Sequence, residues 1–390
     1  MTDSPRPSNT EHPVALGSFR SWLRVLWRGR DIDGIYIPRL LFVCLTTLLT
    51  SPLRAWERIR YGRTLRATTI HPSPIFIIGH WRSGTTHLQN LLCQDKNLGF
   101  LSTFQAMAPG FCLTGDPGMK RRLATLTNSR YKTRLIDNIP LSLDAPQEDE
   151  FALAGLTPWA FIHAFSFPRQ TMEIFRKTVL FEDMGAASMS EWVRAYLSIL
   201  RKATWISGGR RLVAKNCAHS ARIKTLLKLF PDAKFIHIHR NPYQVFLSTL
   251  HLYRTVLLHS QLQRVDPMHI ETCVLRVYVQ LMQRFLRDKA LIPAGNLVEI
   301  RFEDLEREPL DQLQRIYSDL GLPGFGSAER DFRAYLASVS AYRKNRYEMT
   351  ASDVAKINEQ WAFAFDAWGY ERVEPQLAQA SMRHGRYDTN

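Results

Sequence analysis

The sequence is poor in cysteine and has no two cysteines at the close spacing of a metal or redox site. Its 390 residues include five cysteines, and none of them forms a C-x-x-C pair. An odd number of widely spaced cysteines argues against a disulfide framework and against a structural zinc site. The pattern favours a reducing compartment.

A signal peptide and a long apolar run are also missing from the beginning of the sequence. Met1–Pro13 is polar and lacks the basic start and early apolar segment of a signal peptide. Leu40–Leu49 is the most apolar early stretch, and it is shorter than the roughly 20 residues that span a bilayer. We therefore expect a cytoplasmic protein, with at most a peripheral contact to a membrane.

Acidic residues are fewer than basic ones. Lys and Arg number 51 against 36 Asp and Glu, which leaves a surplus of 15 positive charges. Such a surplus favours an anionic partner, namely a nucleotide, a nucleic acid, an acidic glycan or an anionic membrane surface. The sequence has no RNP-like or zinc-finger pattern, so we expect no nucleic-acid partner.

Residues 1–66 predict a basic helical N-terminal extension. The segment Arg20–Arg66 is rich in arginine and contains no lysine, and Trp22, Leu23 and Leu26 recur at helical spacing. A basic amphipathic helix with tryptophans can lie on a membrane surface. The same pattern also fits a helical extension that packs on the main domain, and the sequence leaves both interpretations open.

Residues 67–390 predict one α/β domain in which strands alternate with helices. Short apolar runs bounded by turn residues are typical of buried parallel strands, and strand–helix alternation implies a central parallel sheet flanked by helices on both faces. We expect a P-loop-like three-layer fold, with a helical insertion at about residues 99–208. The expected strands are IFII (Ile75–Ile78), RLVAK (Arg211–Lys215), KFIHIHR (Lys234–Arg240) and NLVEIRF (Asn296–Phe302).

The loop after the first expected strand lacks the lysine of an ATP-binding P-loop. Gly79–Thr86 matches the template G-x-x-x-x-G-K-[ST] except that Thr85 occupies the lysine position. A glycine-rich turn that leads into a helix directs backbone N–H groups at a tetrahedral anion. Arg82 is the cation inside this loop, and no acidic strand end is present to complete a Mg²⁺ site. The loop therefore predicts a metal-free anion site, and a P-loop-type small-molecule kinase that uses ATP is the alternative.

A second motif follows the third expected strand. Arg240 closes that strand, and Ser248 lies eight residues later in the following helix. One helical turn is about 3.6 residues, so the two side chains can converge on one phosphate.

Together these motifs resemble the sulfotransferases that use 3′-phosphoadenosine 5′-phosphosulfate (PAPS), in the bacterial branch related to the protein-tyrosine sulfotransferases. In that family an RSGTT-like loop binds the 5′-phosphosulfate and an R-x-P…S motif binds the 3′-phosphate. The resemblance implies transfer of a sulfuryl group, without a metal, to a hydroxyl of a small-molecule, lipid or carbohydrate acceptor. The PAPS-binding residues implied are Arg82, Ser83, Gly84, Thr85, Thr86, Arg240 and Ser248. Arg343 and Lys344 are a weak match to a further segment of the family that contacts the 3′-phosphate.

The resemblance also implies catalytic residues. Arg82 would stabilise the sulfuryl oxygens, and Lys215, at the end of an expected strand, matches the lysine that contacts the bridging oxygen. The general base remains open between His219 and Glu148. The alternative interpretation of Glu148 is a purely structural one, in which this acid complements the dipole of a helix that begins at Pro146.

Overall fold

A five-stranded parallel sheet forms the centre of the protein. The computed structural model describes residues 12–29, 31–114, 142–340 and 347–375. The strand order is β2-β3-β1-β4-β5, and every pairing between neighbours is parallel. The strands are β1 (Ile75–Ile78), β2 (Leu98–Phe100), β3 (Arg211–Lys215), β4 (Lys234–His239) and β5 (Leu297–Arg301).

The composition of β1 explains why it occupies the middle of the sheet. All four of its residues are fully buried, as expected for a parallel strand with both faces covered. Side chains alternate between the faces, so Phe76 and Ile78 join one hydrophobic cluster, whereas Ile75 and Ile77 join the other. The two core layers on either side of the sheet are thus fixed by one short apolar run.

Helices cover both faces of the sheet. Leu88, Leu313 and Phe332 belong to the cluster on one face, and Val274 and Phe246 belong to the cluster on the other. The helices are α1 (Phe19–Gly29), α2 (Ile37–Leu49), α3 (Ser51–Ala67), α4 (Thr85–Leu92), α5 (Thr103–Met107), α7 (Asp149–Leu156), α8 (His163–Ser166), α9 (Thr171–Thr178), α10 (Ala186–Ile206), α11 (Ile223–Leu229), α12 (Pro242–Ser260), α13 (Pro267–Asp288), α14 (Phe302–Arg307), α15 (Pro309–Asp319), α16 (Phe325–Val339), α17 (Ala351–Gln360) and α18 (Ala362–Trp368).

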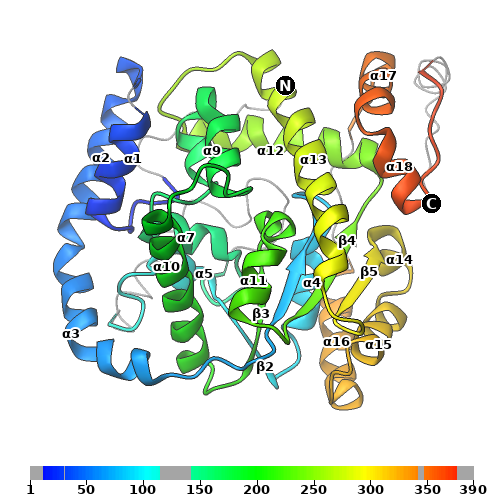
Figure 1. Ribbon diagram of the computed structural model, residues 1–390, viewed down its shortest axis with the longest axis horizontal. Coiled ribbons are helices and arrows are strands. Elements are labelled where there is room, and N and C mark those ends of the chain that lie inside the picture. The colour runs from blue at the N-terminus through cyan, green and yellow to red at the C-terminus, as the bar shows by residue number, and fades with distance from the viewer. Residues whose placement is uncertain (1–11, 30, 115–141, 341–346, 376–390) are drawn as a thin grey trace.

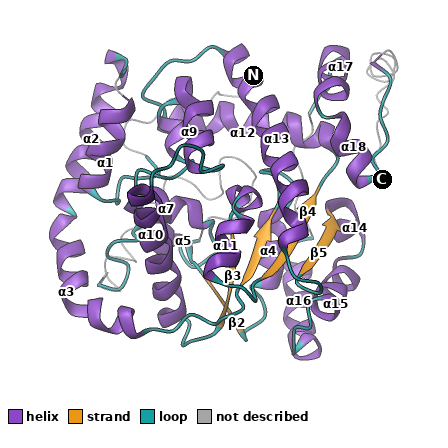
Figure 2. Cartoon of the chain, in the orientation of Figure 1, coloured by secondary structure: helices purple, strands orange, loops and turns teal. Residues whose placement is uncertain are grey.

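The arrangement in space separates three groups of helices. Figure 1 shows α1, α2 and α3 along the left edge, the sheet to the right of centre, α14 beside β5 on the right, and α15 and α16 at the lower right. The helices between β2 and β3 lie on the side of the sheet that faces α2 and α3 (Figure 2). The N-terminal helices therefore lie next to the helices between β2 and β3. Within the described residues, neither group reaches the opposite edge of the sheet, at β5 (Figure 1).

The predicted fold class is confirmed, with differences in detail. The four predicted strands are present, but β4 and β5 end one residue earlier than predicted. The three-residue β2 was not predicted. The helix expected to begin at Pro146 begins at Asp149 instead, and Glu148 is its N-cap residue.

Candidate active site

The loop after β1 has a backbone that glycine makes possible. Gly79 has φ +146°, and a Cβ there would lie 2.3 Å from the carbonyl oxygen of Ile238 on β4. Gly84 has φ +93°, and a Cβ there would lie 2.1 Å from the Phe302 ring. Both positions exclude a side chain for steric as well as conformational reasons. Arg82 also adopts a positive φ, +70°, which is uncommon outside glycine and concentrates at functional sites.

Helix α4 begins directly after this loop without a capping side chain. Its N-cap residue is Gly84, and no side chain accepts a hydrogen bond from the first turn. The first backbone N–H groups of a helix have no partner inside the helix, and the helix dipole adds partial positive charge at the same point. The N–H groups of Thr85 and Thr86 therefore lie where the loop pattern predicts an anion-binding end.

The second predicted motif meets the first one. Arg82 Nε donates a hydrogen bond to Ser248 Oγ at 2.8 Å, and Arg240 Nη1 donates to the Arg82 carbonyl at 3.2 Å. The sheet explains the contact, because β1 and β4 are neighbours and both loops leave from their carboxyl ends. Asn241 caps α12 by accepting a hydrogen bond from the Tyr243 N–H at 3.0 Å, which fixes the direction of the helix that carries Ser248.

Two residues of this region were missed in the sequence. The Phe302 ring lies under the Arg240 guanidinium, 4.5 Å from its central carbon to the ring centroid, a cation–π geometry. Tyr347 Oη lies 3.3 Å from Ser248 Oγ. Phe302 is the last residue of a predicted strand, so its place at the same edge of the sheet was a usable signal; Tyr347 carried none.

A second cluster lies at the end of β3. Lys215 is paired in register with Ile77 of β1, two residues before Gly79. Its Nζ forms a buried ion pair with Glu148 Oε2 at 2.7 Å. The backbone N–H of Cys217 donates to the other carboxylate oxygen at 3.4 Å. The Cys217 Sγ lies 3.6 Å from the Thr85 hydroxyl, so this cluster touches the first helical residue of the loop motif.

His219, the other candidate base, lies in the core. It has no exposed surface, and its Nδ1 accepts from Arg222 Nη1 at 3.3 Å. Its Nε2 lies 2.8 Å from the Tyr196 hydroxyl, which in turn donates to Asp149 Oδ2 at 3.0 Å. Burial, reinforced by Arg222, holds the pKa of His219 well below its usual value. The imidazole is therefore neutral, and both of its nitrogens have partners.

The remaining candidates are placed as follows. Arg343 and Lys344 lie outside the described residues. Among the described residues, no group of three His, Cys, Asp or Glu side chains could hold a metal ion.

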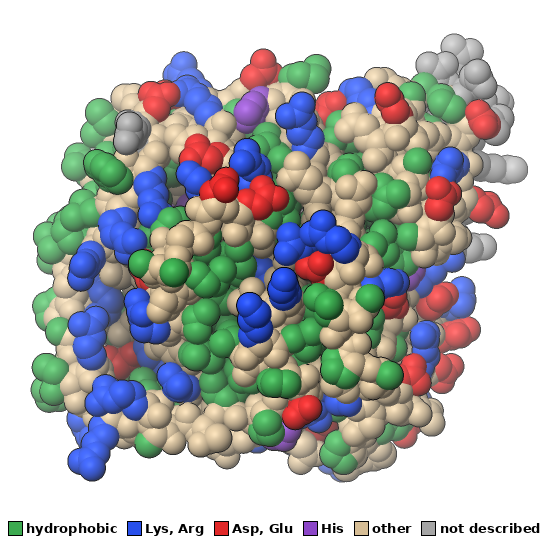
Figure 3. Space-filling model, viewed as in Figure 1, with side chains coloured by type: hydrophobic (Ala, Val, Ile, Leu, Met, Phe, Trp, Pro, Cys, Tyr) green, Lys and Arg blue, Asp and Glu red, His purple; other side chains and the backbone are tan. Residues whose placement is uncertain are grey.

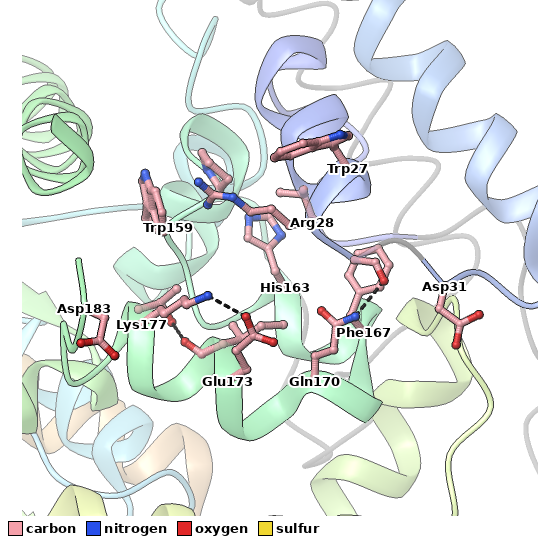
Figure 4. Close-up of a pocket in the computed structure, with 15 residues that line it drawn as sticks. Trp27, Arg28, Asp31, Trp159, His163, Phe167, Gln170, Glu173, Lys177 and Asp183 are labelled. Carbon is pink, nitrogen blue, oxygen red and sulfur yellow. Dashed lines mark hydrogen bonds and ion pairs between the residues drawn. The ribbon is translucent and has the colours of Figure 1, made fainter. Parts of the chain in front are cut away.

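A large cavity lies away from both clusters. It has a volume of about 640 Å³ between α1 and the α8–α9 region, and Figure 4 shows Arg28 over the Trp159 ring on one side and the Lys177–Glu173 ion pair on another. None of its lining residues belongs to either cluster. A much smaller apolar cavity of about 10 Å³ lies beside His80 and Trp81 of the loop.

The glycine-rich loop after the central strand β1 opens a helix, and the loop that carries Arg240 follows the neighbouring strand β4. This arrangement defines a P-loop-like α/β enzyme. Comparison with known proteins narrows this class. Residues 74–326 match the sulfotransferase family, so the chain belongs to the sulfotransferase family and is a sulfotransferase enzyme.

Similar proteins agree with this assignment. The omega-hydroxy-beta-dihydromenaquinone-9 sulfotransferase Stf3 of Mycobacterium bovis is 33% identical over 377 residues, which cover 94% of each chain. The crystal structure of sulfotransferase STF9 from Mycobacterium avium has a TM-score of 0.67 at 19% identity, covering 92% of this chain and 98% of that one. Sulfotransferase STF1 from Mycobacterium tuberculosis gives a TM-score of 0.66 at 18% identity, with 88% and 92% covered.

Proposed function

We propose that this enzyme transfers the sulfuryl group of PAPS to a hydroxyl of a lipid-like acceptor. The observation that carries the proposal is the meeting of Arg82, Arg240 and Ser248 beside the uncapped end of α4. The loop N–H groups and Arg82 would hold the 5′-phosphosulfate, and Arg240 with Ser248 would hold the 3′-phosphate. The site supplies these charges without a metal, because guanidinium groups form charge-assisted hydrogen bonds to anionic oxygens.

The chemistry assigned to the second cluster is proton removal and charge stabilisation. The acceptor oxygen forms a bond to sulfur while the bond from sulfur to the bridging oxygen breaks, and the hydroxyl proton passes to a base. We assign the base to Glu148, which is held at the end of β3 by Lys215. Lys215 would stabilise the charge that develops on the bridging oxygen.

His219 is assigned a positioning role. Its unprotonated Nδ1 faces Arg222, so it has no nitrogen ready to receive a proton from an acceptor. Its neighbours Tyr196 and Asp149 connect it to the first turn of α7, directly after Glu148. We infer that this buried network holds the Glu148 backbone in place.

The acceptor class is inferred from similarity. The relative with 33% identity is named for an omega-hydroxylated dihydromenaquinone, which supports a lipophilic alcohol as the acceptor here. All five cysteines are free, which supports a reducing cytoplasm as the location.

Calorimetry with adenosine 3′,5′-bisphosphate tests the donor. We expect the wild type to bind this nucleotide, and Arg240→Ala and Ser248→Ala to weaken binding about tenfold or more, or about 1.4 kcal/mol. Arg315→Ala on α15, which removes an equally charged but distant side chain, is the matched control and should bind as the wild type does. Equal binding by all variants, or Mg²⁺-dependent turnover of ATP, would overturn the donor assignment.

Substitution of Glu148 tests the base. Glu148→Gln should lower kcat by about 10²–10⁴-fold and leave the affinity for adenosine 3′,5′-bisphosphate unchanged. Tyr196→Phe removes the hydroxyl between His219 and Asp149, so it should lower the free energy of unfolding by about 1–3 kcal/mol with only a small change in kcat. The reverse result, a large loss of kcat in Tyr196→Phe alone, would return the assignment to His219.

A further inference from the structure

An apolar stripe runs along the outer face of α2 and continues onto α3. Its members on α2 are Ile37, Leu41, Leu45, Leu48 and Leu49, at the three- and four-residue spacing of one helical face. Trp56 and Ile59 extend it on α3. The exposed fraction of these side chains runs from 48% at Ile37 to 78% at Ile59. Scattered exposed apolar residues are normal, but a continuous stripe marks an interaction surface.

The opposite face of the same helices is anchored in the protein. Arg39 is fully buried and donates to the carbonyls of Leu258 and Gln261 at the end of α12, at 2.6 and 2.7 Å. Glu57 is buried in an ion pair with Lys202 of α10. Because both helices are held from this side, the stripe cannot rotate into the core and remains on the surface.

Positive charge lies next to the stripe. Arg58, Arg60, Arg63 and Arg66 on α3 are exposed, and Glu57, the single acid between Gly34 and Ala67, is buried and paired. Figure 3 shows hydrophobic side chains along the left edge and blue side chains beside them, where Figure 1 places α2 and α3. A surface with apolar and arginine side chains and no exposed acid complements an anionic one.

Aromatic side chains continue the surface onto α10. The ring of Tyr61 packs edge-to-face on Trp205, with 5.6 Å between centroids. Trp205 and Ile206 are themselves exposed, at 42% and 44%. Tryptophan and tyrosine favour the boundary between lipid and water, because one end of each ring is apolar and the other is polar.

We propose that the α2–α3 stripe and the α3 arginines dock the enzyme on the surface of an anionic bilayer. The apolar side chains enter the boundary between headgroups and acyl chains, and the arginines contact anionic headgroups. This proposal goes beyond the sulfuryl transfer, and it stands or falls independently of the donor. If the acceptor is a lipophilic alcohol, docking brings the enzyme to the phase in which that acceptor resides.

Docking parallel to the surface fits better than insertion across the membrane. The helical segment Gly34–Ala67, which comprises α2 and α3, is long and apolar enough by length and composition to cross a bilayer. Crossing would, however, pull Arg39 and Glu57 from their buried partners and place the α3 arginines in hydrocarbon, where charged groups are costly. An interfacial position keeps every one of these contacts.

Sedimentation of the full-length protein with vesicles tests the proposal. The probes are vesicles of phosphatidylcholine alone and vesicles with about a third of anionic phosphatidylglycerol. We expect binding to the anionic vesicles that weakens as salt is raised. The double variant Leu41→Glu with Leu45→Glu should lose about tenfold or more in partition, whereas Met268→Glu with Leu291→Glu, two equally exposed apolar residues elsewhere, should keep wild-type binding.

A second pair of variants tests the charge. Arg60→Ala with Arg63→Ala should weaken binding to anionic vesicles severalfold and reduce its dependence on salt. Arg315→Ala with Arg333→Ala, on α15 and α16, removes the same charge from another face and should not. Circular dichroism checks that every variant folds, and binding of adenosine 3′,5′-bisphosphate by the variants separates loss of docking from loss of the active site.

Three results would overturn the proposal. The first is equal sedimentation of the stripe variant and its control. The second is a protein that washes off vesicles neither at high salt nor at alkaline pH, which would indicate a helix inserted across the membrane. The third is a wild-type dimer that the stripe variant converts to a monomer while neither binds vesicles, because the stripe would then be an interface between copies of this chain.

Discussion

Asp149 illustrates how a buried position changes the chemistry of a carboxyl group. Burial raises its pKa to about 8, the hydrogen bond from Tyr196 opposes the rise, and the neighbouring carboxylate of Glu148 adds to it. An unfolded aspartate has a pKa of about 3.9. The folded state therefore keeps its proton to higher pH than the unfolded state does, and this contribution to stability is complete below about pH 4 and is lost as pH rises towards 8.

Asp149→Asn should remove this pH dependence. The free energy of unfolding of the wild type minus that of the variant should fall between pH 5 and pH 8, by up to about 1.4 kcal/mol per pH unit. Urea unfolding at several pH values measures the difference. Burial lowers the pKa values of His80 and His163 to about 4. These histidines therefore reduce the stability of the folded state as pH falls below about 6.5. This effect is the same in wild type and variant, so it cancels in the difference.

The exposed Asp319 on α15 provides a control. Asp319→Asn should change the free energy of unfolding only slightly, because this side chain is 44% exposed and pairs with Arg315 at the surface, where an ion pair contributes little. A constant difference between wild type and Asp149→Asn across the same range would mean that Asp149 is ionised in the folded protein.

Single residues also mark what the sequence could and could not predict about the site. Arg240 and Ser248 were predicted to converge on one phosphate, and Arg82 was predicted to belong to a separate anion site in the loop after the first strand. The strand-end positions of Arg82 and Arg240 do place both loops at one edge of a parallel sheet, but the hydrogen bond between Arg82 and Ser248 was not predicted. The partners of Glu148 and His219 were not predictable, because they depend on tertiary contacts with Tyr196 and Lys215 from other elements. The dipole interpretation of Glu148 failed to anticipate that this acid is buried in an ion pair.

Among the elements, the loop between β1 and α4 depends most on its glycines. Gly84→Ala should destabilise the protein for two reasons. Alanine in the positive-φ conformation costs about 1–2 kcal/mol. Overlap of its Cβ with the Phe302 ring costs about 1–3 kcal/mol more. Binding of adenosine 3′,5′-bisphosphate should weaken as well, because the first turn of α4 would shift.

Gly321→Ala isolates the conformational part of this cost. Gly321 has φ +60° with no atom within 4 Å of an added Cβ, so only the backbone strain applies. Denaturant unfolding should therefore give a smaller loss than Gly84→Ala, with nucleotide binding unchanged. Equal losses in the two variants would show that the Phe302 ring moves aside freely.

The anchor between α3 and α10 supplies a second test at this scale. Lys202→Met leaves Glu57 charged and unpaired in the interior and should cost about 3–5 kcal/mol. Glu57→Leu combined with Lys202→Met should recover part of that loss, although the Leu113 N–H and the Pro109 carbonyl, which the pair also satisfies, lose their partners. A double-mutant cycle by denaturant unfolding gives the coupling, and additive losses would exclude a paired anchor.

Elements were predictable from sequence where local composition decides them. β1, β3 and β4 are apolar runs bounded by turns, so their positions agree with prediction within a residue. The strand β2 (Leu98–Phe100) was missed because three residues carry no measurable period, and its pairing with β3 supplies the order that the sequence lacks. The helical character of the N-terminal extension was predicted, but its division into α2 and α3 was not; Pro38 and Pro52 each lie in the first turn of one of these helices.

At the scale of the whole molecule, the cysteines report on folding. Burial raises the pKa of all five thiols, that of Cys273 to about 11 and that of Cys112 to about 12. A thiol-reactive dye at pH near 7.5 should therefore label the native protein about a hundredfold more slowly than free cysteine, since the thiolate is the reactive form. All five should react rapidly in denaturant, whereas one fast thiol in the native protein would reveal local opening around it.

The register between β1 and β4 has a consequence for the two loops that follow these strands. Ile78, the last residue of β1, is paired with His237, which lies two residues before the end of β4, so backbone hydrogen bonds set the gap between Gly79 and Arg240. Replacing side chains around this gap can change the affinity for a ligand, but it leaves the spacing between the two loops unchanged. The paired strands thus hold the two loops at one spacing.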